Sequence, residues 1–573
     1  MRWFEYSAFL VTVVLLARPI SLYLMRVFCG QKTFLDPVCR PVEAQLYRWL
    51  GVDPKREMTA AEYFLCFLAF SMLGTALLFL ILIFQRWLPG GPDPSYLTTP
   101  MTAHLAANTA VSFATTTTWQ AYAGESTLKY FTQVFGLAVQ NFLAGAAGLA
   151  IGLAFIRGFA REGSATLGNF WVDLVRSLLW VLIPLSWVGG LFLVWQGVPL
   201  NLSAYIQAHT REGSVQTIAQ GPVAVLELIK NLGTNGGGFF NANGAHPYEN
   251  PTPLTNFVEM LAIAVIPASF PVLFGRMVGR PRAGWLLLAL MVVLFVAGLV
   301  ICDRAESAEP RRLADLSVVG GNMEGKETRF GVGGSVLAGV VTSNGATGSY
   351  NSMHGSYHPI GVLVLLVNML LGELVFGGLG TGLYSLLMIA LVAVFLGGLM
   401  VGRSPEYVGK TMGPTEAKLV AFYALITPLV VLPLAGWAVA STAGRAGLVT
   451  NDGVRGFTEI VFAYASCMAN NGQNMAGLNA NSPFYNITTI LAMLAGRFVL
   501  AALALELAGR FARQGRKAET TGTLPSDTIT FGILVLGTVA VLPSSSAQPE
   551  REQCPEPVRP GRLRKPRWSA RER

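Results

Sequence analysis

Long apolar stretches alternate with shorter polar connections along almost the whole chain. A helix needs about 20 consecutive, mostly apolar residues to cross the hydrocarbon core of a bilayer, and the hydrophobic pattern predicts nine such stretches. They cover residues 3–28, 63–87, 128–155, 170–195, 257–274, 285–301, 360–400, 419–440 and 487–507. A further stretch, residues 529–542, is short for the bilayer. The pattern therefore predicts an all-α polytopic membrane protein with about ten transmembrane helices.

The seventh stretch, residues 360–400, is too long for one regular helix and is rich in glycine between residues 372 and 382. Basic residues gather on the cytoplasmic side of membrane proteins. If this stretch crosses once, the basic clusters at residues 26–56, 157–161, 276–282, 403–418 and 510–517 all lie on one side. Two crossings would put the 403–418 cluster on the other side. We therefore expect one glycine-broken helix, and an N-terminus outside the cell.

The connections on the opposite side share one organisation. Each of four holds a moderately apolar stretch too short to span, followed by a patch rich in Gly, Asn and Thr. The order of helix, re-entrant pore segment, polar patch and helix recurs every 110 to 130 residues, roughly, and such recurrence decides the fold. We expect four pseudo-repeats at residues 61–160, 161–282, 283–418 and 419–517. An N-terminal helix and cytoplasmic loop (1–60) precede them, and a short last hydrophobic segment with a basic tail (518–573) follows.

Composition narrows the class of protein further. Of the 573 residues, 52% are hydrophobic and only 13% are charged, which leaves no room for a sizeable soluble catalytic domain. The net charge of +9 comes largely from basic residues at helix ends, where lipid headgroups explain them better than nucleic acid does. The stretch from residue 402 to 411 ends in Gly-Lys-Thr but lacks the spacing of a phosphate-binding loop. We expect no nucleotide or organic cofactor in this chain.

The four polar patches suit the dehydration of a cation. They read TTTTWQ (residues 115–120), LGTNGGGFFNAN (232–243), TSNGATG (342–348) and ANNGQNMAGL (469–478). Potassium gives up its water only where several oxygens replace that water at similar distances, as rings of backbone carbonyls do in ion channels. Glycine permits the backbone angles that turn successive carbonyls to one side, and irregular backbone at membrane depth is tolerated where it lines a cavity. The patches therefore predict one potassium filter.

Several of these strings carry a resemblance to a known family. Residues 231–252, NLGTNGGGFFNANGAHPYENPT, resemble the signature of the potassium-binding subunit of Kdp potassium-transporting ATPases. Residues 118–125 (TWQAYAGE), 351–354 (NSMH), 401–410 (VGRSPEYVGK) and 476–485 (AGLNANSPFY) are similar to the same family. The resemblance extends from about residue 4 to about residue 541, and residues 231–252 are its most specific part.

The resemblance implies a role in a larger complex. The family's potassium-binding subunit is non-catalytic, and ATP is hydrolysed by a separate P-type ATPase subunit, with which small accessory membrane subunits are associated. Potassium is the substrate: it is selected at the extracytoplasmic face and passed through an intramembrane tunnel toward the ATPase. The implied location is the bacterial plasma membrane, and the implied fold is that of the potassium transporter superfamily.

The resemblance also implies which residues form the filter. Carried over by position, they are Thr116, Thr117, Thr234, Asn235, Gly236, Ser343, Asn344, Gly345, Asn470, Asn471 and Gly472. Gln120 matches a glutamine near the filter, and Arg403 matches a basic residue at the gate or entry of the tunnel.

The chain departs from common relatives at several points. The first patch has four threonines where many relatives alternate Thr and Asn, and the third and fourth patches also differ from the usual strings. After residue 542 the tail is rich in proline and arginine, which would place basic residues outside. We expect this tail to be disordered and to result from an altered reading frame, although a last segment that fails to span is an alternative.

Charged residues within the apolar stretches are costly and often functional. The candidates are Asp173, Arg176, Glu259, Glu373, Glu459, Arg497 and Glu506. Pairing between helices would explain most of them. Glu373 lies at the glycine break of the seventh stretch, so we expect it near the filter or tunnel.

Two other functions compete with a pump subunit. A stand-alone potassium channel or symporter of the same superfamily would work without an ATPase partner. A polytopic membrane enzyme acting on lipid-linked substrates would need clustered carboxylates or histidines at the membrane interface, and the sequence pattern does not favour it.

Overall fold

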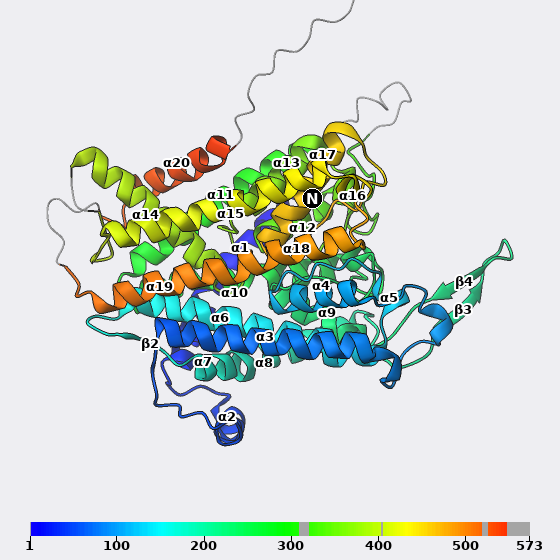
Figure 1. The fold of residues 1–573 in the computed structure, drawn as a ribbon, viewed down its shortest axis with the longest axis horizontal. Helices are drawn as coiled ribbons and strands as arrows, with labels where there is room; N and C mark the ends of the chain where they lie inside the picture. Colours follow the sequence, from blue (N-terminus) through cyan, green and yellow to red (C-terminus); the bar gives the residue numbers. More distant parts are fainter. Residues whose placement is uncertain (1, 309–319, 403–404, 518–524, 547–573) are drawn as a thin grey trace, which may run out of the picture.

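The computed structural model describes residues 2–308, 320–402, 405–517 and 525–546, and nearly all of them belong to helices and their connections. Nine helices in this part of the chain are long and apolar enough to cross a membrane. They run side by side along the long axis of the molecule (Figure 1). The predicted polytopic all-α fold is confirmed, and the predicted basic tail lies outside the described residues.

The nine long helices agree with the predicted stretches, although several contain π-helical or 3₁₀ turns. They are α1 (Arg2–Phe28), α3 (Ala60–Phe84) with η1 (Gln85–Trp87), η3 (Thr132–Ala138) with α6 (Val139–Ala160), α7 (Phe170–Arg176) with η4 (Ser177–Leu182) and α8 (Ile183–Trp195), α10 (Pro253–Met277), α11 (Pro281–Ser307), α14 (Thr381–Val401), α15 (Pro414–Ala440), and α18 (Pro483–Leu494) with η8 (Ala495–Val499) and α19 (Leu500–Arg513). Several begin at a side chain that satisfies free backbone N–H groups, as Thr59 does for α3 and Ser482 for α18.

Helices α6 and α10 form the centre of the bundle. In each, 83% of the most apolar window is buried inside the protein, against 22% for α3 and for α15, which line the periphery. Because both faces of a central helix touch protein, small residues are needed where backbones meet. Gly152 of α6 is one such place, since a Cβ there would overlap the backbone at Gly380. Gly148 packs against the same segment, since a Cβ there would lie 2.8 Å from the Leu379 carbonyl oxygen, so both glycines permit close packing of α6.

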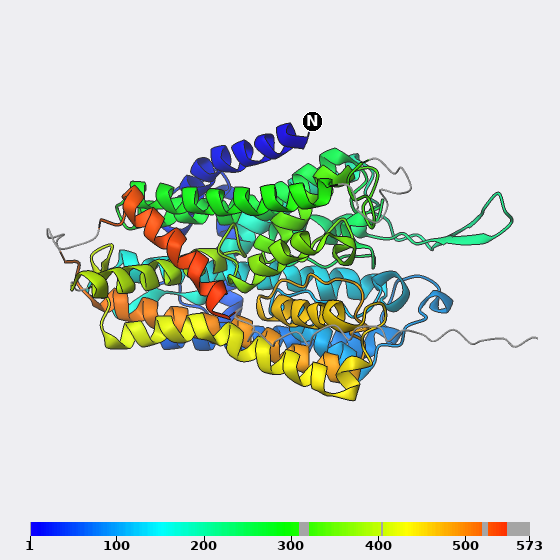
Figure 2. The same ribbon diagram turned by 90° about the horizontal axis from the view of Figure 1, so that it is seen from above.

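The predicted break in the seventh stretch is present. Ten residues separate the end of α13 (Pro359–Leu370) from the start of α14, and this segment, residues 371–380, is irregular. Its backbone has positive φ at Gly372, Glu373, Phe376 and Gly380. The last helix, α20 (Ile529–Ser546), is short and lies obliquely across α14 and α11 (Figure 2).

Four short helices lie between the long ones. They are α4 (Ala103–Ala114), α9 (Val223–Leu232), α12 (Gly331–Asn344) and α17 (Gly453–Met468). The order of long helix, short helix, irregular segment and further helix thus occurs four times, and in the third repeat that further helix is the interrupted pair of α13 and α14. All four short helices occupy the half of the bundle that carries the hairpin of β3 (Ile206–His209) and β4 (Val215–Ile218) (Figure 1). The repeat boundaries given above stay a prediction.

The remaining elements are small and the hydrophobic pattern did not predict them. They are the helices α2 (Asp36–Leu50), α5 (Gly124–Thr127) and α16 (Thr442–Arg445), the 3₁₀ turns η2 (Pro94–Tyr96), η5 (Asn243–Ala245) and η7 (His354–Ser356), and the antiparallel pairs β1 (Met58–Thr59) with β2 (Thr166–Gly168) and β5 (Glu406–Tyr407) with β6 (Lys410–Thr411).

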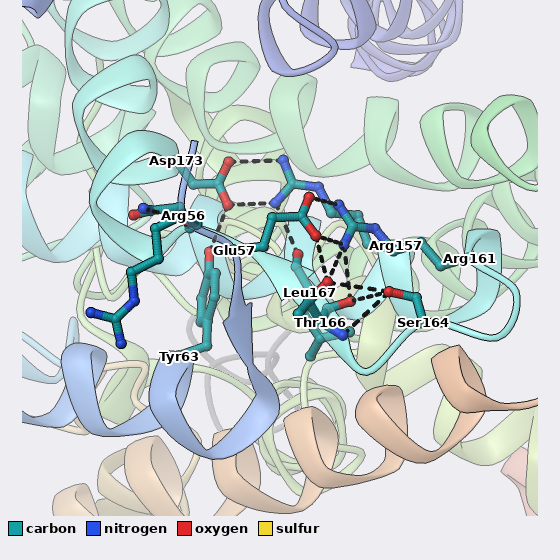
Figure 3. A network of polar contacts seen from close by, with 10 residues as sticks. Arg56, Glu57, Tyr63, Arg157, Arg161, Ser164, Thr166, Leu167 and Asp173 are labelled. Carbon is teal, nitrogen blue, oxygen red and sulfur yellow. Dashed lines mark hydrogen bonds and ion pairs between the residues drawn. The ribbon is translucent and has the colours of Figure 1, made fainter. Parts of the chain in front are cut away.

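A network of ion pairs surrounds β1 and β2, at the end of the bundle opposite the β3–β4 hairpin (Figures 1 and 3). Arg157 of α6 makes a double hydrogen bond to Asp173 of α7, with N–O distances of 2.5 and 2.8 Å. Tyr63 of α3 donates to the same carboxylate at 2.9 Å. A second pair, Arg161 with Glu57, lies on the more exposed side, and the Arg161 hydrogen bonds lower the pKa of Glu57 to about 2. Asp173, a candidate for function in the sequence, therefore joins three helices.

Candidate ion-binding site

The four short helices end in the same way. The residue after each helix keeps a helical φ, between −90° and −74°, and the next residue switches to a positive φ. The following residue returns to negative φ, and the third is positive again. We call these three-residue stretches segments 1 to 4. They are Thr116–Thr117–Thr118, Thr234–Asn235–Gly236, Ala346–Thr347–Gly348 and Asn470–Asn471–Gly472.

Positive φ is costly for residues with a side chain, at about 1–2 kcal/mol each. Even so, five of the ten such non-glycine residues in the described chain lie in these four segments. Strain of this kind persists only where the surrounding structure imposes it, and it gathers at functional sites. Alternation of negative and positive φ turns successive carbonyls toward one side, which is the backbone arrangement that a carbonyl ring requires.

Each segment is tied to the last turn of its own helix. The N–H of the middle residue donates to a carbonyl five residues earlier in all four repeats. The pairs are Thr117 to Ser112 (2.9 Å), Asn235 to Lys230 (3.0 Å), Thr347 to Thr342 (3.3 Å) and Asn471 to Ser466 (2.9 Å). The chain therefore turns back at the negative end of each helix, where a cation is favoured.

The four segments touch one another in a closed ring. A Cβ on Gly236 would overlap the carbonyl oxygen of Thr347 in segment 3. Equivalent overlaps would join segment 3 to segment 4, at Gly348 and Asn471, and segment 4 to segment 1, at Gly472 and Thr117. Segment 1 closes the ring differently, because Thr118 donates its hydroxyl to the carbonyl of Asn235 in segment 2. Three glycines thus occupy places where no side chain fits.

Side-chain hydrogen bonds support the segments from behind. The amide of Asn470 donates to the Thr117 hydroxyl at 2.9 Å and to the Met493 carbonyl at 3.0 Å. The amide of Asn471 donates to the Thr342 carbonyl at 3.0 Å. The hydroxyl of Thr234 accepts the N–H of Leu379 at 3.0 Å, which ties segment 2 to the broken seventh stretch.

Gln120 connects the first two repeats just beyond the segments. Its Oε1 accepts the N–H of Gly238 at 2.8 Å, and its Nε2 donates to the carbonyl of the same residue at 3.1 Å. A Cβ on Gly237 would lie 3.1 Å from that Oε1. Gln120 thus holds the backbone directly after segment 2, and its role near a filter stays a prediction.

A small cavity borders the first residue of every segment. Thr116, Thr234, Ala346 and Asn470 line it, together with residues of α6, α14, η8 and the break. Its volume of about 10 Å³ has room for roughly one water molecule. Glu373, which is 3% exposed, also lines this cavity, and its Oε1 has no hydrogen-bond partner within the described residues. Arg497 also lines the cavity and donates to the Ala144 carbonyl at 3.0 Å.

The structure brings most of the predicted filter residues together. Thr116, Thr117, Thr234, Asn235, Gly236, Asn470, Asn471 and Gly472 all lie in the ring. Ser343 and Asn344 lie instead in the last turn of α12, and Gly345 is the residue that follows this helix. The stretch equivalent to the other three segments is three residues later, at Ala346–Thr347–Gly348. Arg403 lies outside the described residues.

The displacement of the third segment has a physical reason. The N–H of Gly345 donates to the Val341 carbonyl at 2.8 Å, so the helix continues through Asn344. The side chains of Ser343 and Asn344 both donate to the Val340 carbonyl, at 3.1 and 2.9 Å. The sequence does contain a pattern that identifies the observed segment. Gly345 and Gly348 have the same spacing as Gly233 and Gly236 in the second repeat. Alignment of these two glycine pairs gives the observed segment.

The sequence also left the buried charges around segment 2 unassigned. Lys230 of α9 is fully buried and pairs with Glu227 at 2.9 Å and with Glu249. The sequence feature that could have predicted this ion pair is a lysine and a glutamate three residues apart on a short apolar helix. Their third partner is distant in sequence, so only the fold brings it to them.

His354 lies close to segment 4. It is buried, and its Nδ1 is 2.7 Å from the amide nitrogen of Gln473, the residue after that segment. Burial, and then the positive charge of Lys326, lower the pKa of His354 to about 3. The imidazole is therefore neutral at physiological pH.

A neutral buried histidine makes the protein sensitive to acid. Unfolding restores an ordinary histidine pKa of about 6.5, so between pH 6.5 and about 3 the unfolded chain binds the extra proton. Stability should consequently fall as the pH decreases through this range. We expect the thermal midpoint to decrease less between pH 7 and pH 5 in the His354→Gln variant than in the unaltered protein. Equal decreases in both proteins would contradict the assignment.

Comparison with known proteins identifies the family. Residues 7–546 match the family described as "Potassium-transporting ATPase A subunit". A protein of Methylobacterium nodulans named "Potassium-transporting ATPase potassium-binding subunit" is 46% identical over 540 residues, which cover 94% of each chain. Proteins of the same name from Rhodopseudomonas palustris and Solibacter usitatus are also 46% identical, over 542 and 537 residues, and again cover 94% of the relative's length.

A solved structure supports the fold. The potassium transporter TrkH from Vibrio parahaemolyticus superposes with a TM-score of 0.53 at 13% identity, covering 89% of this chain and 99% of its own. At that identity the similarity concerns the fold alone. The family match and the identities above settle the classification: the chain belongs to the family of potassium-binding subunits of potassium-transporting ATPases.

Proposed function

We propose that this chain binds potassium in the ring of segments 1 to 4 and passes it through the membrane toward an ATP-hydrolysing partner. One observation carries the proposal: four equivalent helix ends turn into strained backbone that closes into a ring through three glycines and one threonine hydroxyl. The names of the relatives, which are potassium-binding subunits, agree with it.

The chemistry follows from the backbone. Equivalent carbonyls of four segments around one axis give layers of four oxygens, which can replace the water around a potassium ion. The four helices contribute the negative ends of their dipoles to the same place. The residues proposed to bind potassium are Thr116, Thr117, Thr118, Thr234, Asn235, Gly236, Ala346, Thr347, Gly348, Asn470, Asn471 and Gly472. Segment 3 here replaces the predicted stretch of Ser343, Asn344 and Gly345.

The ion's further path begins at the cavity beside the segments. Glu373 supplies a carboxylate oxygen there, in a break that interrupts the seventh stretch. An acidic group at that depth favours a cation that has left the ring. We propose that Glu373 lies at the entrance to the intramembrane tunnel. The role of Arg403 at the gate or entry of the tunnel stays a prediction.

Energy for transport must come from another protein of the complex. The sequence predicts no nucleotide site in this chain, and the relatives are named as subunits of an ATPase. We propose that the partners are the catalytic P-type ATPase and the small accessory membrane subunits of a Kdp complex. The basic residues at the helix ends favour a plasma membrane orientation in which the N-terminus is extracytoplasmic.

Uptake by reconstituted proteins tests this function against a stand-alone channel or symporter. Vesicles that contain the complete complex should accumulate potassium, or rubidium as its tracer, only when ATP is supplied to the ATPase subunit. Vesicles that contain this chain without its partners should show no uptake above that of empty vesicles. ATP-independent uptake by the isolated chain would overturn the proposal and favour the channel.

A further inference from the structure

A buried charge cluster lies directly behind segment 2. Lys230, Glu227 and Glu249 are each 0% exposed, and Glu259 is 1% exposed. The Lys230 ammonium pairs with Glu227 at 2.9 Å, with Glu249, and with the side-chain oxygen of Asn243 at 3.1 Å. Within the described residues, no three acidic, histidine or cysteine side chains are placed to hold a metal ion together. The cluster therefore needs an explanation other than a metal site.

Lys230 is bonded to segment 2 through its backbone. Its carbonyl accepts the N–H groups of Asn235 at 3.0 Å and of Gly236 at 2.8 Å. Any movement of this lysine consequently moves two of the three residues of segment 2.

Glu249 is bonded to the loop that leaves segment 2. Its Oε1 accepts the N–H of Phe240 at 2.7 Å, while its Oε2 contacts Lys230. Phe240 in turn stacks on His246 at a centroid distance of 3.8 Å. The Lys230–Glu249 pair thus fixes the chain on both sides of segment 2, before it through a carbonyl and after it through an N–H.

The lysine is peculiar to the second repeat. The residues whose carbonyls make the equivalent bond in the other repeats are Ser112, Thr342 and Ser466, all small hydroxyl residues. A lysine is therefore not needed to turn the chain at the end of the helix. Buried ion pairs are also a poor way to gain stability, because apolar replacements are often as stable or more stable. We therefore attribute this buried pair to the backbone conformation that it holds, and not to a gain in stability.

We propose that Lys230 and Glu249 are positioning residues that set the potassium affinity of segment 2. They hold the carbonyls of Thr234 and Asn235 at the spacing that potassium requires, and the neighbouring glutamates add negative charge behind the bound ion. This inference rests on the function proposed above.

The test uses the assembled complex and its potassium-dependent ATPase activity. Glu249→Gln keeps an oxygen for the Phe240 N–H but removes the charge that Lys230 requires. We expect it to raise the potassium KM about tenfold or more while kcat stays within about twofold, because binding and not ATP hydrolysis is affected. Lys230→Met should raise KM at least as much, and Lys230→Arg should restore part of the affinity. A rise in rubidium or sodium acceptance should accompany the loss.

A second buried pair provides a matched control. Glu306 bonds Lys326 at 2.9 Å through Oε2 and accepts the N–H of His358 at 2.7 Å through Oε1. The chemistry is that of Lys230 and Glu249, but these bonds reach none of the four segments. Glu306→Gln should therefore lower thermal stability and leave KM nearly unchanged. If Glu249→Gln shifts KM no more than Glu306→Gln does, the positioning role is refuted.

A variant of segment 2 itself separates this inference from the proposed function. Gly236→Ala should disturb potassium binding whatever Lys230 and Glu249 do. A disturbed Gly236→Ala variant with an unaffected Glu249→Gln variant would overturn the positioning role alone. Normal potassium binding in both variants would overturn the filter as well.

Discussion

A complex that carries Gly236→Ala should assemble but lose its high affinity and selectivity for potassium. The glycine has φ +80°, which is strained for alanine, and the new Cβ would overlap the Thr347 carbonyl oxygen. The carbonyl cannot stay in place, so segments 2 and 3 must separate. Displacements of about 1 Å at a site of fixed geometry cost about a hundredfold. Potassium-dependent ATPase activity, measured with potassium, rubidium and sodium, should show this loss as a higher KM and weaker discrimination.

The same reasoning distinguishes the two candidates for segment 3. Gly348→Ala should resemble Gly236→Ala, because its Cβ would overlap the Asn471 carbonyl. Ser343→Ala should change selectivity little, since its hydroxyl bonds to Val340 and Asn368 and lies within α12. The opposite ranking would return segment 3 to the stretch of Ser343, Asn344 and Gly345.

Gly453→Ala is the matched control for backbone strain. This glycine, at the start of α17, has φ +62°, but no atom lies within 4 Å of the Cβ that alanine would add. The substitution therefore strains the backbone without overlap at any segment. It should lower stability by about 1–2 kcal/mol and leave potassium KM unchanged. An equal loss of selectivity in Gly453→Ala would show that general destabilisation explains the effect.

The fold was largely predictable because a bilayer permits few backbone structures in a chain that crosses it. An apolar run of sufficient length must become a helix, since unpaired backbone groups are too costly in hydrocarbon, and all nine long helices of the described chain follow that rule. The glycines between residues 372 and 382 predicted the break because glycine is a poor helix former, which is also a local property. Helix α2 was missed because its apolar residues occupy one face of a short helix instead of forming a run.

The site was predictable to the extent that it is local. Segments 1, 2 and 4 follow short apolar stretches and contain the residues that the sequence singled out, with Thr118 added in segment 1. That these residues bind potassium stays a prediction. Segment 3 depends on whether α12 ends before Ser343 or after Asn344, and the bond from the Gly345 N–H to the Val341 carbonyl places that end after Asn344. Glu249 is 19 residues from Lys230, and Lys230 is 13 residues from Asn243, so their cluster is a tertiary feature. Only Glu227 and Lys230 are close in sequence, so no local pattern predicts the whole cluster.

The largest effect on stability should come from Asp173→Ala, at the far end of the bundle from the four segments. Asp173 and Arg157 have side chains only 3% and 12% exposed, and the carboxylate is shared with Tyr63 (Figure 3). Its removal leaves a guanidinium buried without its counter-ion, which costs about 3–5 kcal/mol. Thermal unfolding of the purified protein should show a markedly lower midpoint, with potassium KM unchanged in the protein that remains folded.

Two further variants test whether the loss of stability in Asp173→Ala comes from the buried, unpaired charge of Arg157. Glu57→Gln breaks the neighbouring pair with Arg161, whose side chains are 48% and 26% exposed, so it should cost at most about 1 kcal/mol. The double variant Arg157→Met with Asp173→Leu should regain much of the lost stability, because apolar residues of similar size can replace a buried pair. If the double variant is instead as unstable as Asp173→Ala, the pair does more than neutralise a buried charge. The specific bonds from Arg157 to the Leu167 carbonyl of β2 and from Tyr63 to Asp173 would then be required for the packing of α3, α6 and α7.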